Sequence, residues 1–513
     1  MTAVDVKIGD AWYYSLSDWS VESSCTPLVA GDTTGGVGAV SFTLPEAAKS
    51  KRLQGDPCLL VDPHMGTMAG ELRLAGGNGV NTTITGYSKI AALNVNRTAE
   101  AYTGTLRGAI LYYLGLCGVT QRIAVQASLA TRSVRYIGWQ GNVLDKLKDL
   151  CAAQQMELTQ VGQFYVFREP GSRIVFARSF DDWTWQASED QLAQNVEVAW
   201  YDTSQPTSQI VYPAGGWTAD VPVFQVGAGE IATYEIDMMP QEDAAKPIGM
   251  SVLSIDQPSC VASVARQYSG TASVYAVAGK DGLPIQPAQW TAGGGDLKVE
   301  ILEAGLKLKV TITGSSETEY APYQIAMTSG TSDAYSSLRL YGNAMRFKRG
   351  VLTMQTGLDG DRAPQETTPI IDNPFLNSYD AAHRAAVGVL SKHSSATYTI
   401  NGTVTQVEAG PENVITFFGS EDISNDPAAH PFGNLEGSFF FAEGMVFRIR
   451  SVTYTPGGAR FTAEQHHTGL MDSALLSYAT GTSSRTATAW NAAYPAGLTA
   501  DDFNADPTNG FSL

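Results

Sequence analysis

The sequence is poor in charged residues, cysteine and histidine. Asp, Glu, Lys and Arg make up only 16% of its 513 residues, while 43% of the residues are hydrophobic. This composition argues against a disordered chain and supplies enough apolar side chain for several cores. The five cysteines are irregularly spaced and form no C-x-x-C motif, so we expect neither a disulfide framework nor a thiolate zinc site. We expect the protein to be made in a reducing compartment, with free thiols that are buried and pack as small hydrophobic side chains. The cysteines concerned are Cys25, Cys58, Cys117, Cys151 and Cys260.

Long apolar runs and basic segments are also missing. No stretch reaches the ~18 consecutive apolar residues of a membrane-spanning helix. The first residues, MTAVDVKIGDAWYY, lack the basic and apolar regions of an export signal, so we expect none. Acidic residues outnumber basic ones by 51 to 33, which gives a formal net charge of −18. Such a charge argues against a basic face that clamps DNA, RNA or anionic lipid.

The motifs of common catalytic and cofactor sites are absent. The sequence contains no G-x-S-x-G, P-loop, H-E-x-x-H or EF-hand pattern, and its glycine runs AGGNG and AGGGD precede no predicted helix. His64 and His430 stand in predicted loops, where a polar turn residue is the usual role. His466 and His467 follow a strand, point to opposite faces and are expected to be an exposed pair. We therefore expect no enzyme activity and no catalytic, cofactor-binding or metal-binding residues.

Clustered carboxylates and a tryptophan pair are the remaining candidates for a site. A glycoside hydrolase needs two carboxylates roughly 5 to 10 Å apart, which a sequence cannot show, so we interpret the acidic pairs as solvated loop residues. Trp183 and Trp185 are two residues apart and would share a strand face, as a sugar platform, a partner anchor or core residues; we expect them in a core. The sequons at Asn81, Asn96 and Asn401 carry no weight without an export signal. The acidic residues concerned are Asp181, Asp182, Glu189, Asp190, Asp359 and Asp361.

The pattern of the chain predicts a mainly β protein with a small α+β module. Glycine makes up 51 of the 513 residues and is surrounded by Thr, Ser and Asn, a composition typical of short strands joined by turns. Apolar residues alternate in segments 4–8 and 40–44, which predicts half-buried strands in a small barrel or sandwich over residues 1–100.

Two segments change to a helical period. Apolar residues recur at steps of three and four over 105–117 and 142–155, and Asn142 is the predicted N-cap of the second helix, with Asp145 three residues later. A predicted hairpin, MELTQV then FYVFRE, follows and could bury one apolar face together with the helices. Further along, apolar and polar residues alternate over 297–301 and 306–312, on either side of Glu303-Ala304-Gly305. This pattern predicts a hairpin with one solvent-exposed face. A helix is predicted over 379–390 and strands over 396–404, 414–418, 445–452 and 460–465.

The order of these pieces resembles the tail-tip, or baseplate, hub of long-tailed siphophages that infect actinobacteria, often called a minor tail protein. The similar segments are PLVAGDTTGGVGAVSFTLPE at 27–46, YIGWQGNVLDKLKDLCAAQQMELTQVGQFYVFR at 136–168 and IDNPFLNSYDAA at 371–382, together with FRIRSVTYT at 447–455 and WNAAYPAGLTADDFNA at 490–505. They span nearly the whole chain in order and consist of strand, turn and packing residues.

The resemblance implies a mainly β fold of tail-tube-like barrels or sandwiches in a baseplate-hub architecture. The implied segments are an N-terminal tube-like domain (1–100), an α+β module (101–190), strands returning to the hub sheet (191–246), a sandwich-like insert (247–347), a second tube-like domain (348–470) and an extended C-terminal arm (471–513).

The resemblance also implies a homotrimeric structural protein of the virion tail tip, assembled in the bacterial host cytoplasm. Such a hub continues and closes the tail tube and opens at infection by a shift between closed and open rings. Its partners would be the distal tail protein ring, the tape-measure protein and receptor-binding or tail-fibre proteins, and genome DNA would pass through without specific binding. Acidic residues lining the channel would repel DNA phosphates. The alternatives are a carbohydrate-binding or carbohydrate-active β protein and a cell-surface adhesin.

Overall fold

The computed structural model describes the chain from residue 4 to residue 466 with gaps. The stretches outside the description are 9–10, 33, 46–56, 63–65, 78–80, 162–163, 171–179, 189–194, 213, 215–225, 227–228, 242–245, 256–292, 315–339, 356–368, 394–396, 405–434 and 443–444. The described part is mainly β, as predicted, and none of its helices is long and apolar enough to cross a membrane.

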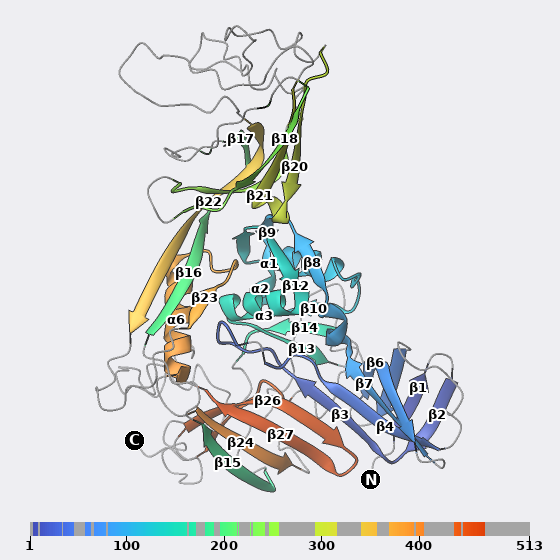
Figure 1. Ribbon diagram of the computed structural model, residues 1–513. Coiled ribbons are helices and arrows are strands. Elements are labelled where there is room, and N and C mark those ends of the chain that lie inside the picture. The colour runs from blue at the N-terminus through green and yellow to red at the C-terminus, as the bar shows by residue number, and fades with distance from the viewer. Residues whose placement is uncertain are drawn as a thin grey trace.

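A 12-stranded sheet at one end of the molecule combines strands from both ends of the chain (Figure 1). Its order is β15-β24-β27-β26-β3-β4-β7-β6-β5-β1-β2, and β25 also pairs with β26. The junction between the two halves is the antiparallel pairing of β26 with β3, where Val452 lies opposite Ser23. The strands are β1 (Val4–Ile8), β2 (Ala11–Leu16), β3 (Trp19–Ser24), β4 (Ala39–Pro45), β5 (Pro57–Asp62), β6 (Gly66–Gly77), β7 (Asn81–Ser88), β15 (Asp182–Ser188), β24 (Thr397–Val404), β25 (Phe439–Ala442), β26 (Met445–Thr455) and β27 (Gly458–Gln465).

The α+β module lies beside the middle of this sheet (Figure 1). It was predicted over 101–190, but its described elements span residues 89–168, and residues 182–188 form β15 of the 12-stranded sheet. Thr105 caps α1 by accepting a hydrogen bond from the Gly108 amide, and Asn142 caps α3 through the amides of Leu144 and Asp145. The hairpin β13–β14 follows α3, and β10 pairs with β14 in parallel. The elements are η1 (Lys89–Leu93), β8 (Asn96–Ala99), β9 (Tyr102–Thr105), α1 (Leu106–Gly115), β10 (Ile123–Val125), α2 (Ala127–Ala130), β11 (Ser133–Tyr136), β12 (Trp139–Asn142), α3 (Val143–Gln154), β13 (Glu157–Val161) and β14 (Phe164–Arg168).

Two further sheets and one helix complete the described structure. The long strand β22 pairs with β16, β17 and β19, and β23 joins β16 in parallel. The hairpin β20–β21 alternates as predicted and takes β18 as a third strand. The strands of residues 191–246 thus pair within these smaller sheets and not with the 12-stranded sheet. The elements are β16 (Asn195–Thr203), β17 (Thr207–Tyr212), β18 (Ile231–Asp237), β19 (Gly249–Ile255), β20 (Asp296–Leu302), η3 (Glu303–Gly305), β21 (Lys307–Thr313), β22 (Leu340–Gln355), β23 (Ile370–Asp372) and α6 (Tyr379–His393).

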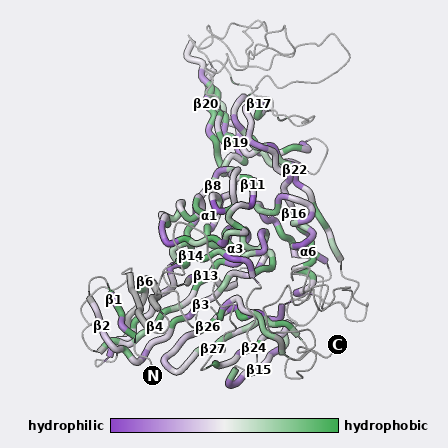
Figure 2. Tube along the Cα trace, turned by 180° about the vertical axis from the view of Figure 1, so that it is seen from behind, coloured by the Kyte–Doolittle hydropathy of each residue, from purple (hydrophilic) through white to green (hydrophobic). Residues whose placement is uncertain are grey.

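Separate apolar cores hold these parts. One lies on a face of the 12-stranded sheet and joins residues of both halves, including Val6, Phe42, Ile400 and Phe461. Figure 2 shows hydrophobic and hydrophilic residues interspersed along the strands, as the burial of alternate residues requires. A second core packs α1, α3 and α6 together.

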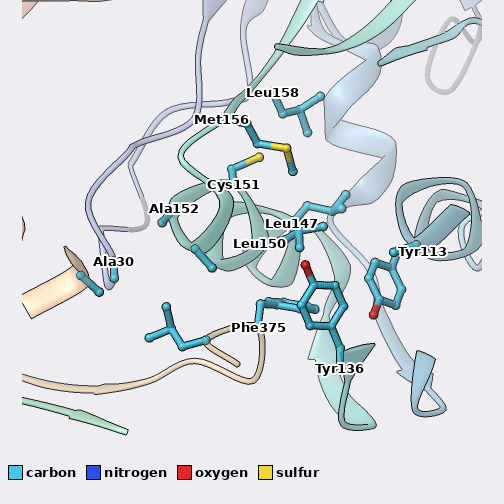
Figure 3. Close-up of a cluster of buried hydrophobic side chains, with 14 of the residues drawn as sticks. Ala30, Tyr113, Tyr136, Leu147, Leu150, Cys151, Ala152, Met156, Leu158 and Phe375 are labelled. Atoms are coloured by element: carbon cyan, nitrogen blue, oxygen red, sulfur yellow. The ribbon is translucent and has the colours of Figure 1, made fainter. Parts of the chain in front are cut away.

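The segment after β23 connects α6 to the α+β module. Phe375 is 1% exposed, and its ring centroid lies 5.0 Å from that of Tyr136 and 5.8 Å from that of Tyr113 (Figure 3). The Asn373 amide group donates to the carbonyl of Asp149 at 2.8 Å, and its side-chain oxygen accepts from the Phe375 amide. The IDNPF segment (371–375) therefore attaches the chain before α6 to the α+β module through the Phe375 ring and the Asn373 amide group.

Candidate functional surface

The second face of the 12-stranded sheet carries many short polar side chains over β15, β24, β27, β26, β3, β4 and β7. Strands β3, β4, β7, β24, β26 and β27 bury alternate residues over most of their length, and the residues between them are mainly Ser, Thr or Asn. Because directly paired residues of an antiparallel sheet share a face, these side chains form rows across strands. The rows are Thr184–Asn401–Thr462–Ser451, then Asp182–Thr403–Arg460–Thr453–Glu22, and Ser20–Ser41–Thr85.

An open hollow of about 340 Å³ lies in this face over β15, β24, β27 and β26. Five of its eleven lining residues carry hydroxyl groups, and Trp183 and Phe461 also line it. The hydroxyl of Thr462 donates to the side-chain oxygen of Asn401 at 2.9 Å. Asp182 and Arg460 contribute the only charged side chains among the residues that line it. The hollow can hydrogen-bond a polar surface, but it has no cluster of cations for phosphates.

The outermost strand beside β1 carries exposed aromatic rings. Trp12 is 41% exposed and Tyr14 is 68% exposed, and their rings stack with centroids 6.1 Å apart. The ammonium group of Lys7 lies 5.9 Å from the Trp12 ring, within the range of a cation–π contact. These three residues, the β2 aromatic patch, have the composition of a protein-contact surface.

A buried ionic network fixes the α+β module to the sheet. The Glu157 carboxylate, 1% exposed, pairs with Arg168 of β14 through one oxygen and with Arg448 of β26 through the other. Arg168 also donates to the Glu436 carbonyl at 2.7 Å, and the Glu436 carboxylate accepts from the hydroxyl of Tyr454. Burial alone would raise the pKa of Glu157, but the two guanidinium groups outweigh it and hold that pKa below its usual value.

A second ionic cluster fixes α6 to the same sheet. The ammonium group of Lys392 lies 2.9 Å from the carboxylate of Asp32 and 2.7 Å from that of Glu464, and Arg450 lies 3.7 Å from Asp32. Burial would raise the pKa of Asp32, but Arg450, Lys392 and the hydroxyl of Thr34 lower it to about 2. The loop after β3, α6 and β27 are therefore held by charges from distant parts of the sequence.

The tryptophan pair departs from its predicted environment. Trp185 is 58% exposed, and Trp183 is only partly buried against the core of the 12-stranded sheet. Both lie on β15, the last strand of the sheet, which has a neighbouring strand on one side only within the described structure. The prediction of two core residues was therefore wrong for Trp185, because alternation identifies a strand face but not what covers it.

The other predicted candidates do not assemble into a site. Asp181 and Asp182 are exposed, as expected, whereas Glu189, Asp190, Asp359, Asp361, His64, His430 and His467 lie outside the described residues. His466 is half-buried rather than exposed, with its ring centroid 4.9 Å from that of Phe439. Where the structure is described, no group of three metal-binding side chains occurs.

The described cysteines are free, and their environments agree mainly with the prediction. Cys25 and Cys151 are buried and Cys117 is half-buried. Burial raises the pKa of the Cys151 thiol to about 12, so this thiol stays protonated at neutral pH. The side chain of Cys58, and Cys260 as a whole, lie outside the described residues.

Sequence reasoning did not identify the residues of the two ionic clusters. Glu157, Arg168 and Arg448 are separated by up to 291 positions, and each stands at an ordinary place in a strand. The one available signal was the unusual placing of charged residues in otherwise apolar strands, such as FRIR at 447–450.

Comparisons with known proteins give weak structural likenesses. No family model matches the sequence, and no curated protein matches it. The 43 kDa tail protein of prophage MuSo2 from Shewanella oneidensis is 9% identical, with a TM-score of 0.41, and the match covers 92% of this chain and all of that one. A tail protein from Neisseria meningitidis MC58 is 8% identical with a TM-score of 0.42, covering 91% and 97%. Prophage tail protein gp18 from Listeria monocytogenes EGD-e is 7% identical with a TM-score of 0.40, covering 90% and 94%. At these TM-scores the likenesses assign neither a fold family nor a function.

Proposed function

We propose that this chain is a non-enzymatic structural protein of a phage tail, the trimeric hub at the distal end of the tube. The observation that carries the proposal is the 12-stranded sheet, in which strands of residues 4–88 and 397–465 form one surface through the β26–β3 junction. Two tube-like domains that merge edge to edge in this way provide a wide wall segment, and copies around an axis would extend the wall into a ring.

The polar face of this sheet suits the channel side of that ring. Short hydroxyl side chains offer DNA no base-stacking platform, and Arg460 is the only cation in the rows of paired residues described above. A surface of this kind would let the genome pass without specific binding, with Asp182 and Glu22 as its carboxylates. The wall is then mainly neutral, a milder barrier to DNA than the acidic lining expected from the net charge.

The β2 aromatic patch supplies a contact surface for a neighbouring copy. Trp12 and Tyr14 expose large rings on an outermost strand, where contact with another subunit would bury them. The remaining partners follow from the resemblance: a distal tail protein ring above, the tape-measure protein inside, and receptor-binding or tail-fibre proteins outside. The chain would assemble in the host cytoplasm and reside at the virion tail tip, where opening of the ring would release DNA.

One observation favours the carbohydrate-binding alternative, namely the exposure of Trp185. A sugar site would need hydrogen-bonding groups beside that ring. Asp182 and Thr184, the polar residues that β15 contributes to the hollow, are on the opposite face of the strand from Trp185, because residues an odd number of positions apart alternate in direction along a strand. The alternation of β15 therefore separates the Trp185 ring from Asp182 and Thr184, which supports the structural role.

Substitution at the β2 aromatic patch tests the proposal. The variant Trp12→Ser/Tyr14→Ser should fold like the parent and shift the trimer–monomer equilibrium toward monomer by at least tenfold, measured by analytical ultracentrifugation. Thr83→Ser, on an exposed site of β7, is the matched control and should leave the equilibrium unchanged. Equal association of the double variant and the parent would refute the assignment of this contact surface, and quenching of Trp185 fluorescence by cell-wall polysaccharide would favour the alternative.

A further inference from the structure

The β15 edge is an unprotected strand edge in the described structure. Its sequence, DWTWQAS, contains one charged residue, Asp182, and neither the lysine nor the proline that often prevents strand addition at an edge. Trp185 exposes 58% of its surface there, and its ring has one described aromatic neighbour, Tyr398, with centroids 5.7 Å apart. An edge that combines open backbone groups with a large apolar ring is suited to pairing with another strand.

The chain leaves the described structure close to this edge. Glu464 near the end of β27 pairs with Thr399 of β24, which pairs with Gln186 of β15, so these residues form one row across three strands. The side chain of Gln465 also accepts a hydrogen bond from the Tyr398 amide. The residues after His466 therefore begin at the same end of the sheet as Trp185, two strands away.

A few residues are enough to connect the end of β27 to the outer side of β15. Three strand spacings of ~4.8 Å amount to about 14 Å, and an extended residue spans ~3.3 Å, so about five residues bridge it. A strand that starts after such a connection would run antiparallel to β15, because β15 and β27 are both antiparallel to β24. The connection has the form of a Greek-key crossing.

The sequence after His466 can supply that strand. Residues 467–513 contain five charged side chains and five aromatic ones, a composition that favours burial over solvation. Residues 474–480, ALLSYAT, follow a connection of seven residues, 467–473, which is longer than the about five that the distance needs. Leu476 and Tyr478 share one face of a strand. Placed beside β15, that face would cover the Trp185 ring.

We infer that residues 474–480 of this chain add to the free edge of β15 as an antiparallel strand and cover Trp185. The occupant is the segment of the same molecule, since a tether of a few residues gives it an effective concentration that a second copy in solution does not reach. The inference does not depend on the proposed function, and it assigns the start of the expected C-terminal arm (471–513) to the chain's own sheet.

Hydrogen exchange of the β15 amides tests the inference in the full-length chain. The β15 amides that point away from β24 should exchange about 100-fold faster in Ser477→Pro than in the parent, because proline removes an amide and breaks the added strand. Thr499→Pro, in the same C-terminal segment but outside the proposed strand, is the matched control and should leave exchange unchanged. A chain ending at His466 should match Ser477→Pro, and exchange in α3 reports that each variant is folded.

Two results would overturn the inference. The first is equal exchange of the β15 amides in the parent and in Ser477→Pro. The second is protection that disappears on dilution of the parent, because this would show that another copy covers the edge.

Discussion

Removal of the Glu157 carboxylate should weaken the attachment of the α+β module to the sheet. Glu157→Gln keeps the shape of the side chain but leaves the guanidinium groups of Arg168 and Arg448 buried without their shared anion. Breaking a buried ion pair from one side costs about 3–5 kcal/mol, since the remaining charge is desolvated and uncompensated. Two guanidinium groups depend on this one carboxylate, so the upper part of that range applies.

Native-state hydrogen exchange measures this cost where it arises. The opening free energy of amides in β13, β14 and β26 should fall by about 3–5 kcal/mol in Glu157→Gln, while amides of β20 and β21 should keep their parent values. Glu300→Gln, which removes an exposed carboxylate paired with Lys298 and Lys309, is the matched control and should not change these amides.

A triple substitution distinguishes the loss of charge balance from a loss of packing. Replacing Glu157, Arg168 and Arg448 together by methionine removes the two guanidinium groups along with the carboxylate that they share, so this variant should be more stable than Glu157→Gln. A loss below about 1 kcal/mol in Glu157→Gln, within the range of exposed pairs, would refute the reasoning.

Three other parts of the structure give expected outcomes. Phe375→Ala should lower the opening free energy of α6 by about 3–5 kcal/mol, measured by hydrogen exchange, because it removes a buried ring from three aromatic contacts. Asn142→Ala should destabilise α3 by about 1 kcal/mol in the same assay, whereas Asn401→Ala on the exposed face should change it little. The pKa of Asp32 is lowered to about 2 in the folded protein, so its stabilisation is complete above the unfolded value near 3.8 and is lost as pH falls toward 2. Thermal unfolding of Asp32→Asn should therefore differ from the parent at pH 6, with the difference shrinking below pH 4, and an equal difference at pH 2 would contradict the assignment.

The local parts of the fold could be predicted from the sequence. The capped helix α3, the hairpin β13–β14 and the hairpin β20–β21 all appear within a few residues of their predicted bounds. Each of them depends on neighbours along the chain: a capping side chain, a turn or an alternation of apolar residues.

The long-range parts could not be predicted. The β26–β3 pairing joins residues more than 400 positions apart, and nothing in the local pattern of either strand specifies its partner. The environment of Trp185 was missed for the same reason, because burial depends on what lies beyond the strand. The IDNPF segment was noticed by resemblance alone, and its packing role follows only from the contacts of Phe375 and Asn373.

The mass and shape of the purified full-length particle test the central proposal most directly. Multi-angle light scattering with averaged electron microscope images should give three copies of the 54.7 kDa chain around an open channel. The hydroxyl-rich face of the 12-stranded sheet should line that channel. A single-copy particle at every protein concentration, or a ring with that face turned outward, would contradict the account.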